Sequence, residues 1–356
     1  MGWESAVHWF HQRLAHINAK LMTLHGILFV SAIFADIAIT LLGAYWTFQI
    51  ERRDRPEQTP ERFLAFVFPK KVWLHPSAFL DYQLYAIQYF IGFPFSLPMV
   101  IGMATITAFV VGGDTPPDPH ASILPTLACA ALIALAVDFS FYAGHVMQHR
   151  VKLFWEFHKV HHSAEVLTPP TLNRTHPLQD LPTIAMMTAT FAAVLIVFSR
   201  FQPINVEMTI PLGLDLLLWS RILLFYRLRH SHIPMFFPDW AATVFFSPVH
   251  HQTHHSSQQR HFDSNYGLNL VIWDRIFGTL VTPEHPSTYR LGLSNHEEQE
   301  FNRSALHLYS VPFRNIWRHL TGKAGNEDDT TGERVRSLLA PPGAVSSLGK
   351  DQKKSA

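Results

Sequence analysis

The sequence predicts an all-α protein that crosses a membrane about four times and carries a helical, histidine-rich domain on one side of it. Three observations predict this fold class. Only 15% of the 356 residues are charged, against about 25% in an average soluble protein, while 48% are hydrophobic. Five apolar runs follow one another along the chain, and many of the 23 histidines gather in short clusters after them. The net charge of +1 gives no reason to expect a nucleic-acid partner.

Each apolar run is long enough to cross a hydrocarbon layer of about 30 Å as a helix. The second run contains Pro94 and Pro98, so it forms either one kinked crossing or a short re-entrant pair. The last two runs are separated by a short link and are expected to form a helical hairpin. The runs cover, in order, residues 26–48, 83–112, 123–145, 181–198 and 208–226.

Loop charges predict the orientation of these helices. Residues 49–78 contain six Lys and Arg side chains, whereas residues 113–121 contain none. Because cytoplasmic loops carry the excess of Lys and Arg, we expect 49–78 in the cytoplasm and 113–121 on the opposite side. If 83–112 crosses once, every histidine cluster then emerges at the cytoplasmic face.

Histidines recur at helical spacing after the apolar runs. One pair is four residues apart and two triplets stand at positions i, i+3 and i+4, so each set lies on one face of its helix. Imidazole suits zinc, copper, iron or nickel, and a zinc ion takes only three or four protein ligands. Nine imidazoles are therefore about right for two ions. The nine are His145 and His149, then His158, His161 and His162, then the isolated His230, and finally His251, His254 and His255.

Two assignments stay open from spacing alone. His230 stands in the sequence RHSH with His232 two residues on, so either can be the ligand. His250 shares the four-residue spacing of the last cluster, because it lies four residues before His254. A basic or pH-sensing surface is the alternative interpretation of the clusters. Metal binding is favoured over it because the same triplet spacing occurs twice.

Five segments, in the order in which they follow one another, resemble the fatty acid hydroxylase and sterol desaturase superfamily. They are DFSFYAGHVMQH at 138–149, LFWEFHKVHHS at 153–163, NRTHP at 173–177, SPVHHQTHH at 247–255 and DSNYGLNLVIWDRIFGT at 263–279.

This resemblance implies an integral membrane enzyme in which the nine histidines hold two iron ions, with zinc as an alternative in purified protein. Such an enzyme activates O2 and hydroxylates an unactivated C–H bond of a lipid, either an acyl chain or a sterol. Lipid or sterol desaturation and alkylglycerol-type oxygenation are alternatives within the superfamily. A metal-binding transporter is a more distant alternative, because a transporter should place its ligands near the middle of the bilayer.

Further polar residues in these motifs are expected to bind metal or to support the ligands. Metal-bound imidazoles usually donate their second N–H to a carboxylate or a carbonyl. The candidates for these roles are His176, His232, His250, Asp138, Asn173, Arg174, Asp263, Asn265 and Asp274.

No flavin, haem or nicotinamide motif such as GxGxxG occurs in a fitting context, so electrons are expected from a separate reductase, cytochrome or ferredoxin. The lipid substrate and the membrane are the other expected partners. The membrane is either a bacterial cytoplasmic membrane or the endoplasmic reticulum. We expect an N-terminal segment at 1–24, a membrane-embedded oxygenase domain at 25–320 with histidine boxes at 145–162 and 230–255, and a disordered cytoplasmic tail at 321–356.

Overall fold

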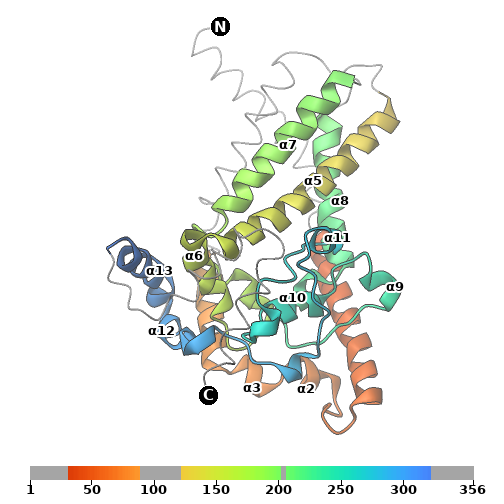
Figure 1. The fold of residues 1–356 in the computed structure, drawn as a ribbon. Coiled ribbons are helices and arrows are strands. Elements are labelled where there is room, and N and C mark those ends of the chain that lie inside the picture. The colour runs from red at the N-terminus through yellow and green to blue at the C-terminus, as the bar shows by residue number, and fades with distance from the viewer. Residues whose placement is uncertain (1–30, 89–121, 202–205, 322–356) are drawn as a thin grey trace, which may run out of the picture.

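The computed structural model describes residues 31–88, 122–201 and 206–321 (Figure 1). Within these ranges the chain is helical and forms no strand, apart from isolated bridges such as that between Phe245 and Leu270. The all-α prediction is therefore confirmed. The predicted N-terminal segment, most of the predicted run 83–112 and nearly all of the predicted tail lie outside the described residues.

The described ranges contain both long and short helices. A long helix, Ser31–Asp54, precedes α2, and helical residues 76–88 follow α3. The labelled α-helices are α2 (Phe63–Val67), α3 (Lys70–Trp73), α5 (Ile123–Arg150), α6 (Lys152–His162), α7 (Leu181–Phe201), α8 (Val206–Leu223), α9 (Asp239–Ala242), α10 (Pro248–His254), α11 (Ile272–Ile276), α12 (Glu298–Phe301) and α13 (Ala305–Leu320). The 3₁₀ helices are η1 (Pro169–Asn173), η2 (Tyr226–His230), η3 (Gln259–His261), η4 (Pro286–Thr288) and η5 (Ser294–His296).

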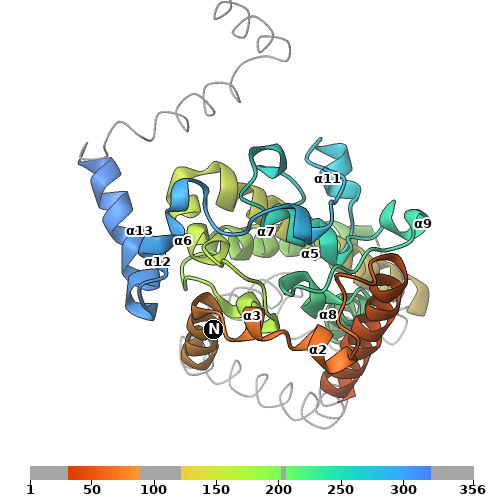
Figure 2. The same cartoon turned by 90° about the horizontal axis from the view of Figure 1, so that it is seen from below.

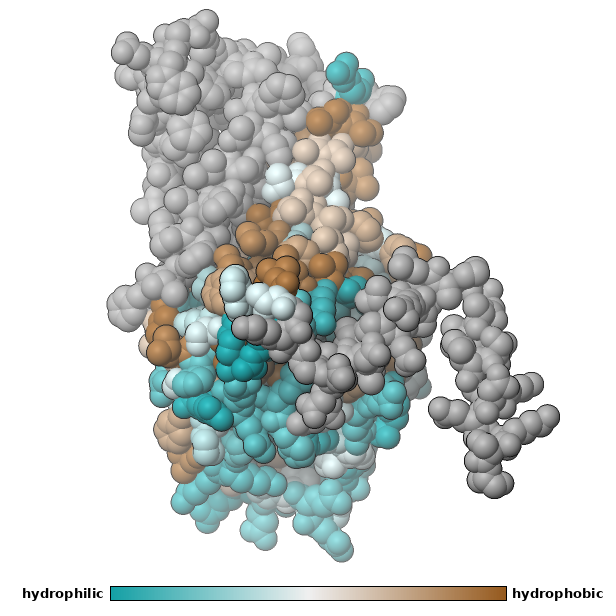
Figure 3. Space-filling model, turned by 60° about the vertical axis from the view of Figure 1, so that its left-hand side comes forward, coloured by the Kyte–Doolittle hydropathy of each residue, from teal (hydrophilic) through white to brown (hydrophobic). Residues whose placement is uncertain are grey.

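Three of the described helices are long and apolar enough to cross a membrane: Ser31–Asp54, α5, and α7 up to Phe198. Large apolar side chains on these helices face outwards, with Phe34 69% and Leu124 72% exposed. Burial of such side chains in hydrocarbon is favourable, whereas their exposure to water is not. Figure 3 shows a hydrophobic surface over the long helices and a mainly hydrophilic surface below them. The chain is therefore an integral membrane protein.

The predicted hairpin also forms two helices, α7 and α8. However, α8 contains three charged residues and is not among the three helices that qualify as spans. The number of crossings, about four, stays a prediction.

α5 is the central helix, because it packs along both α7 and α8. Ile133 and Val137 of α5 are fully buried with Phe191 and Leu195 of α7. Near the end of α5, a Cβ atom added to Gly144 would lie only 2.6 Å from the Cα atom of Thr183. Only glycine permits this close approach of the two helices. The contact fixes the position of the end of α5, where His145 and His149 lie.

α6 and α9 to α13 form a domain below α5, α7 and α8, and the helix Ser31–Asp54 lies beside this domain (Figures 1 and 2). α6 begins two residues after α5 ends, and it packs against both α5 and α13. α10 packs against η2, which follows α8. Two predicted histidine clusters that lie far apart in the sequence, on α6 and α10, are thereby placed in one domain.

Candidate metal centre

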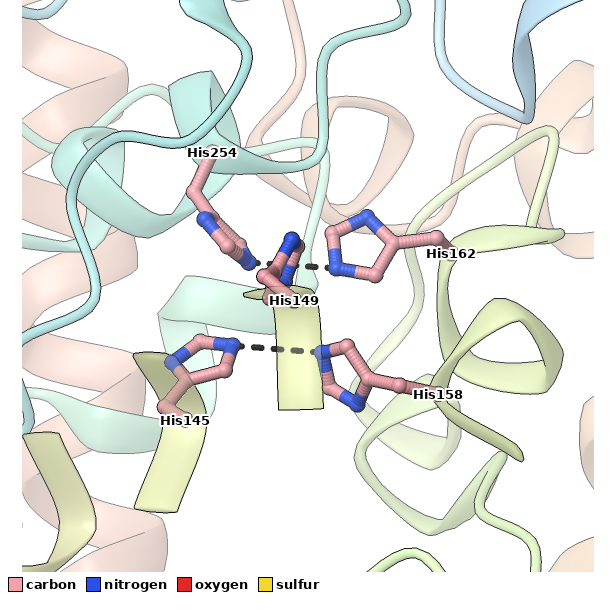
Figure 4. Close-up of side chains that lie close together, drawn as sticks. All are labelled: His145, His149, His158, His162 and His254. Carbon is pink, nitrogen blue, oxygen red and sulfur yellow. Dashed lines mark hydrogen bonds between the residues drawn. The ribbon is translucent and has the colours of Figure 1, made fainter. Parts of the chain in front are cut away.

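The nine histidines gather in two groups. The five-histidine group contains His145, His149, His158, His162 and His254, and the four-histidine group contains His161, His230, His251 and His255. Within each group, one nitrogen from every ring lies within 4.8 Å of the corresponding nitrogens of the others. Figure 4 shows the five rings of the first group converging from α5, α6 and α10.

The two histidine triplets divide between the groups in opposite ways. On α6, His158 and His162 belong to the five-histidine group, while His161 belongs to the four-histidine group. In the second triplet, on α10 and its C-cap residue, His251 and His255 belong to the four-histidine group and His254 belongs to the five-histidine group. Each triplet therefore contributes to both groups. The rings of His162 and His255, one from each group, stack with their centroids 4.6 Å apart, so the groups are neighbours.

Local capping selects which face of α10 turns towards the groups. Ser247 is the N-cap of this helix, and its side chain forms a reciprocal capping box with His250. The Ser247 hydroxyl lies 2.7 Å from His250 Nδ1. Because His250 is engaged in the cap, its ring takes no part in either group.

Hydrogen bonds from three rings to backbone carbonyls fix which nitrogen carries the proton. His145 Nδ1 lies 3.0 Å from the carbonyl oxygen of Tyr266, His254 Nδ1 lies 2.7 Å from that of Ser264, and His161 Nδ1 lies 3.3 Å from that of Arg174. A carbonyl only accepts, so each Nδ1 donates and, in a neutral ring, each Nε2 carries a lone pair. These lone pairs point into the two groups.

The Nε2 atoms of the four-histidine group approach one another closely. His230 Nε2 lies 3.1 Å from His161 Nε2 and 2.9 Å from His251 Nε2, and His251 Nε2 lies 3.1 Å from His255 Nε2. His161 Nε2 carries a lone pair, so it can only accept a hydrogen bond. Hydrogen bonds can then account for all three contacts only if one N–H group donates to two nitrogens at once. In the five-histidine group, buried His149 Nε2 has no hydrogen-bond partner. A cation at each point of convergence would accept these lone pairs.

Burial keeps the rings outside the membrane spans in their neutral form. All four rings of the second group are buried, and burial lowers the pKa of His161 to about 3. Burial also lowers the pKa of His158 and His254 well below the usual value, and neighbouring imidazoles lower it further. The neutral ring is the form that binds a metal.

The donor set fits transition-metal ions. Nitrogens on opposite sides of one ion lie about 4.2 Å apart when each metal–nitrogen bond is about 2.1 Å. The nitrogens of each group lie within 4.8 Å of one another, which is only slightly more than this separation. Imidazole nitrogens without carboxylates suit iron, copper, nickel or zinc, and do not suit magnesium or calcium. Both histidine groups are therefore able to bind a metal ion.

Three further histidines that the sequence offered as candidates lie outside both groups. His232 Nε2 lies 2.8 Å from the carbonyl oxygen of Phe66, so His230 and not its neighbour joins the four-histidine group. His250 caps α10, as described above. His176 Nδ1 accepts from the Leu178 N–H, and its Nε2 lies 3.3 Å from the carbonyl oxygen of Tyr309.

The candidate carboxylates hold the backbone of residues 263–279 and do not hydrogen-bond to a ring of either group in the described contacts. Asp274 accepts from the backbone N–H groups of Tyr266 and Gly267, both at 2.8 Å. Asp138 accepts from the Asn269 N–H and from Trp273 Nε1, both at 2.9 Å. Asp274 therefore acts on the five-histidine group indirectly, because it positions Tyr266, whose carbonyl accepts from His145.

Turn geometry accounts for two other candidates in this segment. Asp263 and Asn265 have φ angles of 57° and 56°, a left-handed conformation that Asp and Asn tolerate better than most residues. The Asn265 side chain bonds to the backbone of Val281 in both directions, and the Asp263 carboxylate accepts from the Tyr266 hydroxyl. Both residues therefore shape the loop that carries the carbonyls of Ser264 and Tyr266.

Arg174 is the candidate with the most extensive contacts. It is completely buried and donates from Nη1 to Asp81 Oδ1 at 2.7 Å and from Nε to the carbonyl of Val160 at 3.0 Å. Its own carbonyl accepts from His161. Asn173 lies beside it at the end of η1, where its carbonyl accepts from the Thr175 N–H. The ion pair between Arg174 and Asp81 therefore anchors the backbone segment whose carbonyl orients the His161 ring in the four-histidine group.

Sequence reasoning missed Asp81 and the contacts of Trp155. Asp81 has one visible signal, a carboxylate inside the otherwise apolar stretch FLDYQLYAI, and it is fully buried. Trp155 lies on α6 with its ring centroid 4.9 Å from that of His149 and 5.5 Å from that of His162. Its position one turn before His158 places it on the same helical face, but many core tryptophans share that pattern.

Comparisons with known proteins agree with this geometry. A family model described as fatty acid hydroxylase matches residues 130–279. Alkylglycerol monooxygenase from Caenorhabditis elegans is 29% identical over 58% of this chain and 38% of its own length. Ornithine lipid hydroxylase OlsE from Rhizobium tropici is 28% identical over 44% of this chain and 43% of its own length. Human alkylglycerol monooxygenase is 27% identical over 50% of this chain and 36% of its own length.

The match therefore spans less than half the length of these curated relatives. No solved structure matches the chain significantly. The resemblance inferred from the five sequence motifs is confirmed by the family model, which contains all nine clustered histidines. Residues 130–279, which include all nine clustered histidines, thus match the fatty acid hydroxylase family model.

Proposed function

We propose that this chain is a membrane-bound, O2-dependent oxidoreductase that hydroxylates a lipid, with two iron ions held by its histidines. The observation that carries the proposal is the division of nine converging imidazoles into two adjacent groups on a membrane protein. Nine ring nitrogens exceed the coordination of one ion, whereas five and four suit two ions.

The five-histidine group would hold one iron and the four-histidine group the other. Two adjacent irons supply the activation of O2 and the removal of a hydrogen atom from an unactivated carbon, chemistry that no protein side chain provides. The chain itself orients the rings, because His145, His161 and His254 hold their protons on Nδ1 and direct Nε2 inwards. Burial of the rings excludes water from the ions.

A lipid substrate is supported by the membrane spans and by the relatives. The names of those relatives refer to alkylglycerols and to an ornithine lipid. The histidine-bearing end of α5 belongs to a helix long enough to span the bilayer, so a lipid chain can approach the groups without crossing water. Hydroxylation of a carbon in a lipid chain is the reaction that we favour.

Alkylglycerol-type oxygenation is the second candidate. Relatives named alkylglycerol monooxygenase come from four animals, at 27–30% identity. In such a reaction the oxidised carbon would be the one bonded to the ether oxygen of the lipid. A desaturase of the same superfamily stays a third possibility that the same experiment distinguishes.

A metal transporter is disfavoured by the positions of the charges and ligands. Asp36, an acidic residue within the first span, is engaged in an ion pair with Arg227. The histidines lie at and beyond the end of α5, not near its middle. A transporter should place its ligands near the middle of the bilayer.

The experiment is to supply ¹⁸O2 to membranes containing the chain and an electron donor, and to analyse the lipids by mass spectrometry. A hydroxylated product carrying one ¹⁸O atom is expected. An ether lipid cleaved to a labelled aldehyde or acid would favour the second candidate, and an unlabelled product lighter by two hydrogens would indicate desaturation. Oxygen taken from H2¹⁸O, or no lipid change while metal flux changes, would reject the oxygenase. The matched control is His254→Ala, which should give no product.

We also propose that the histidine domain faces the cytoplasm and receives electrons from a separate reductase, cytochrome or ferredoxin. The six Lys and Arg residues of 49–78 support this orientation. Cysteines introduced singly at 49–78, 163–177 and 256–266 should react with a membrane-impermeant thiol reagent only from the cytoplasmic side. Reaction of any of them from the opposite side would contradict the orientation. The chain's single cysteine, Cys129, is buried and gives little background.

A further inference from the structure

α13 carries a second apolar face that the other described elements leave largely exposed. Its inner face packs on the domain through Leu308, Val311 and Pro312, all buried. Its outer face exposes four large apolar side chains at spacings of seven, four and three residues, which places them in one stripe. They are Leu306 (73% exposed), Phe313 (52%), Trp317 (65%) and Leu320 (78%).

The position of α13 puts this stripe close to two places where spans leave the membrane. α13 packs on α6, which begins two residues after α5 ends. The ring of Phe313 lies 5.4 Å from that of Phe157 and 5.3 Å from that of His176. His176 stands five residues before α7 begins. α13 therefore lies beside the ends of both α5 and α7.

The composition of α13 suits a lipid surface. The helix contains no acidic residue, and Arg318 is exposed next to Trp317, while Arg314 and His319 are paired with Glu300 and Glu156 of the protein. Apolar and aromatic side chains on one face and basic residues beside them are typical of helices that lie in the plane of the interface. Trp317 adds the aromatic type that prefers this region.

Polar contacts connect α13 firmly to the helix that bears three of the histidines. Asn315 Nδ2 donates to Glu156 Oε2 at 2.9 Å, and His319 Nε2 lies 3.5 Å from Glu156 Oε1. Glu156 is buried on α6 and is paired with Lys159 at 3.1 Å. A shift in the position of α13 would therefore be transmitted to α6 at Glu156, two residues before His158.

We propose that α13 is an interfacial membrane anchor, whose stripe of Leu306, Phe313, Trp317 and Leu320 inserts into the bilayer and holds α6 at a fixed depth below it. The occupant of the stripe is lipid. The inference concerns attachment to the membrane and does not depend on the proposed function. Helices of this kind bury their apolar face about 5–10 Å into the boundary between headgroups and acyl chains.

Spin labels in lipid nanodiscs test the insertion. Single cysteines replace Leu306, Phe313, Trp317 and Leu320 one at a time in a Cys129→Ala background, and Gln259→Cys on the exposed segment after α10 is the water-facing control. Labels on the stripe should be relaxed by O2, which concentrates in lipid, several-fold more than by a water-soluble nickel chelate. The control label should show the reverse. Relaxation of the stripe labels by nickel would overturn the proposal. Protection from both reagents would also overturn it, because another protein segment or a second copy would then cover the stripe.

Amide hydrogen exchange tests the anchoring of α6. In nanodiscs, Trp317→Asn combined with Leu320→Asn should accelerate exchange over α13 and the first turns of α6 by about tenfold or more, equal to about 1.4 kcal/mol. The matched control is Trp240→Asn, an equally exposed tryptophan on α9, which should leave exchange in α13 unchanged. Unchanged exchange in the double variant would contradict the proposal. Exchange over α10 reports whether either variant disturbs the fold as a whole.

Discussion

The two histidine groups differ in what holds their rings in place. The five-histidine group depends on a loop, since the carbonyls of Tyr266 and Ser264 accept from two of its rings. The four-histidine group depends on the core, since the carbonyl that accepts from His161 belongs to the buried Arg174. Two residues of the first group, His145 and His149, are only partly buried, whereas all four residues of the second are buried.

This difference gives the two groups different kinds of support. The five-histidine group draws two of its residues, His145 and His149, from the end of a membrane span. The four-histidine group is enclosed and fixed by a buried ion pair. We therefore expect changes to the loop to affect the first group selectively, and changes to the ion pair to affect the second.

The largest expected effect comes from removing one ligand of each group. His254→Ala should remove the ion of the five-histidine group and His161→Ala that of the four-histidine group, because each ring directs a lone pair at the site. Each variant should retain about one ion per chain and lose more than about 100-fold in activity, beyond the range for residues that only support ligands. Elemental analysis and Mössbauer spectroscopy measure this. His296→Ala, a change at an exposed histidine, is the control. Loss of both ions from either variant would show that the two groups are one coupled site.

Breaking the buried ion pair should have the next largest effect. Arg174→Ala leaves Asp81 buried without its partner, which typically costs about 3–5 kcal/mol of the free energy of unfolding. Denaturation in mixed micelles measures the loss, and metal should leave the four-histidine group first. Arg260→Ala, which breaks an exposed pair with Glu284, should have a much smaller effect. Equal effects of the two variants would contradict the anchoring role of Arg174.

A smaller effect is expected from the carboxylate that holds the loop. Asp274→Asn replaces one of the two acceptors for the N–H groups of Tyr266 and Gly267 and loosens the carbonyl that orients His145. Metal affinity of the five-histidine group should fall about 10–100-fold, measured by competition with a chelator, while the four-histidine group keeps its ion. Glu284→Gln is the control on an exposed carboxylate. Equal weakening of both groups would mean that the loop supports the whole domain.

The smallest expected effect concerns acid sensitivity near Arg174. Burial lowers the pKa of His176 to about 4, and its Nδ1 accepts from the Leu178 N–H, so protonation would break that bond. A lowered pKa means that the unfolded state binds the proton more tightly, so this contribution to stability is present above about pH 6.5 and is lost as the pH falls towards 4. His176→Asn should therefore show a shallower loss of melting temperature than the unchanged chain between pH 7 and pH 5. An unchanged slope would contradict this assignment.

Local sequence patterns were sufficient for the elements and for the ligand candidates. Apolar length predicted α5, α7 and α8, and helical periodicity placed each histidine triplet on one face. The structure brings all nine predicted histidines together, although their binding of metal stays a proposal. The sequence did not reveal which of His230 and His232 joins, because they lie two residues apart at the end of η2 and only the packing of His232 against Phe66 separates them.

The sequence by itself determined the helical class, three apolar helices long enough to span a membrane and the face that each histidine occupies, because these depend on residues within a few turns of one another. Tertiary structure decided how the nine rings divide, with each triplet shared between two groups, and it decided that Arg174 pairs with Asp81. The decisive contacts join residues such as His162 and His254, 92 positions apart, and Arg174 and Asp81, 93 positions apart. Helical periodicity fixes which way a side chain points from its own axis, but only the packing of one axis against another fixes what it meets there.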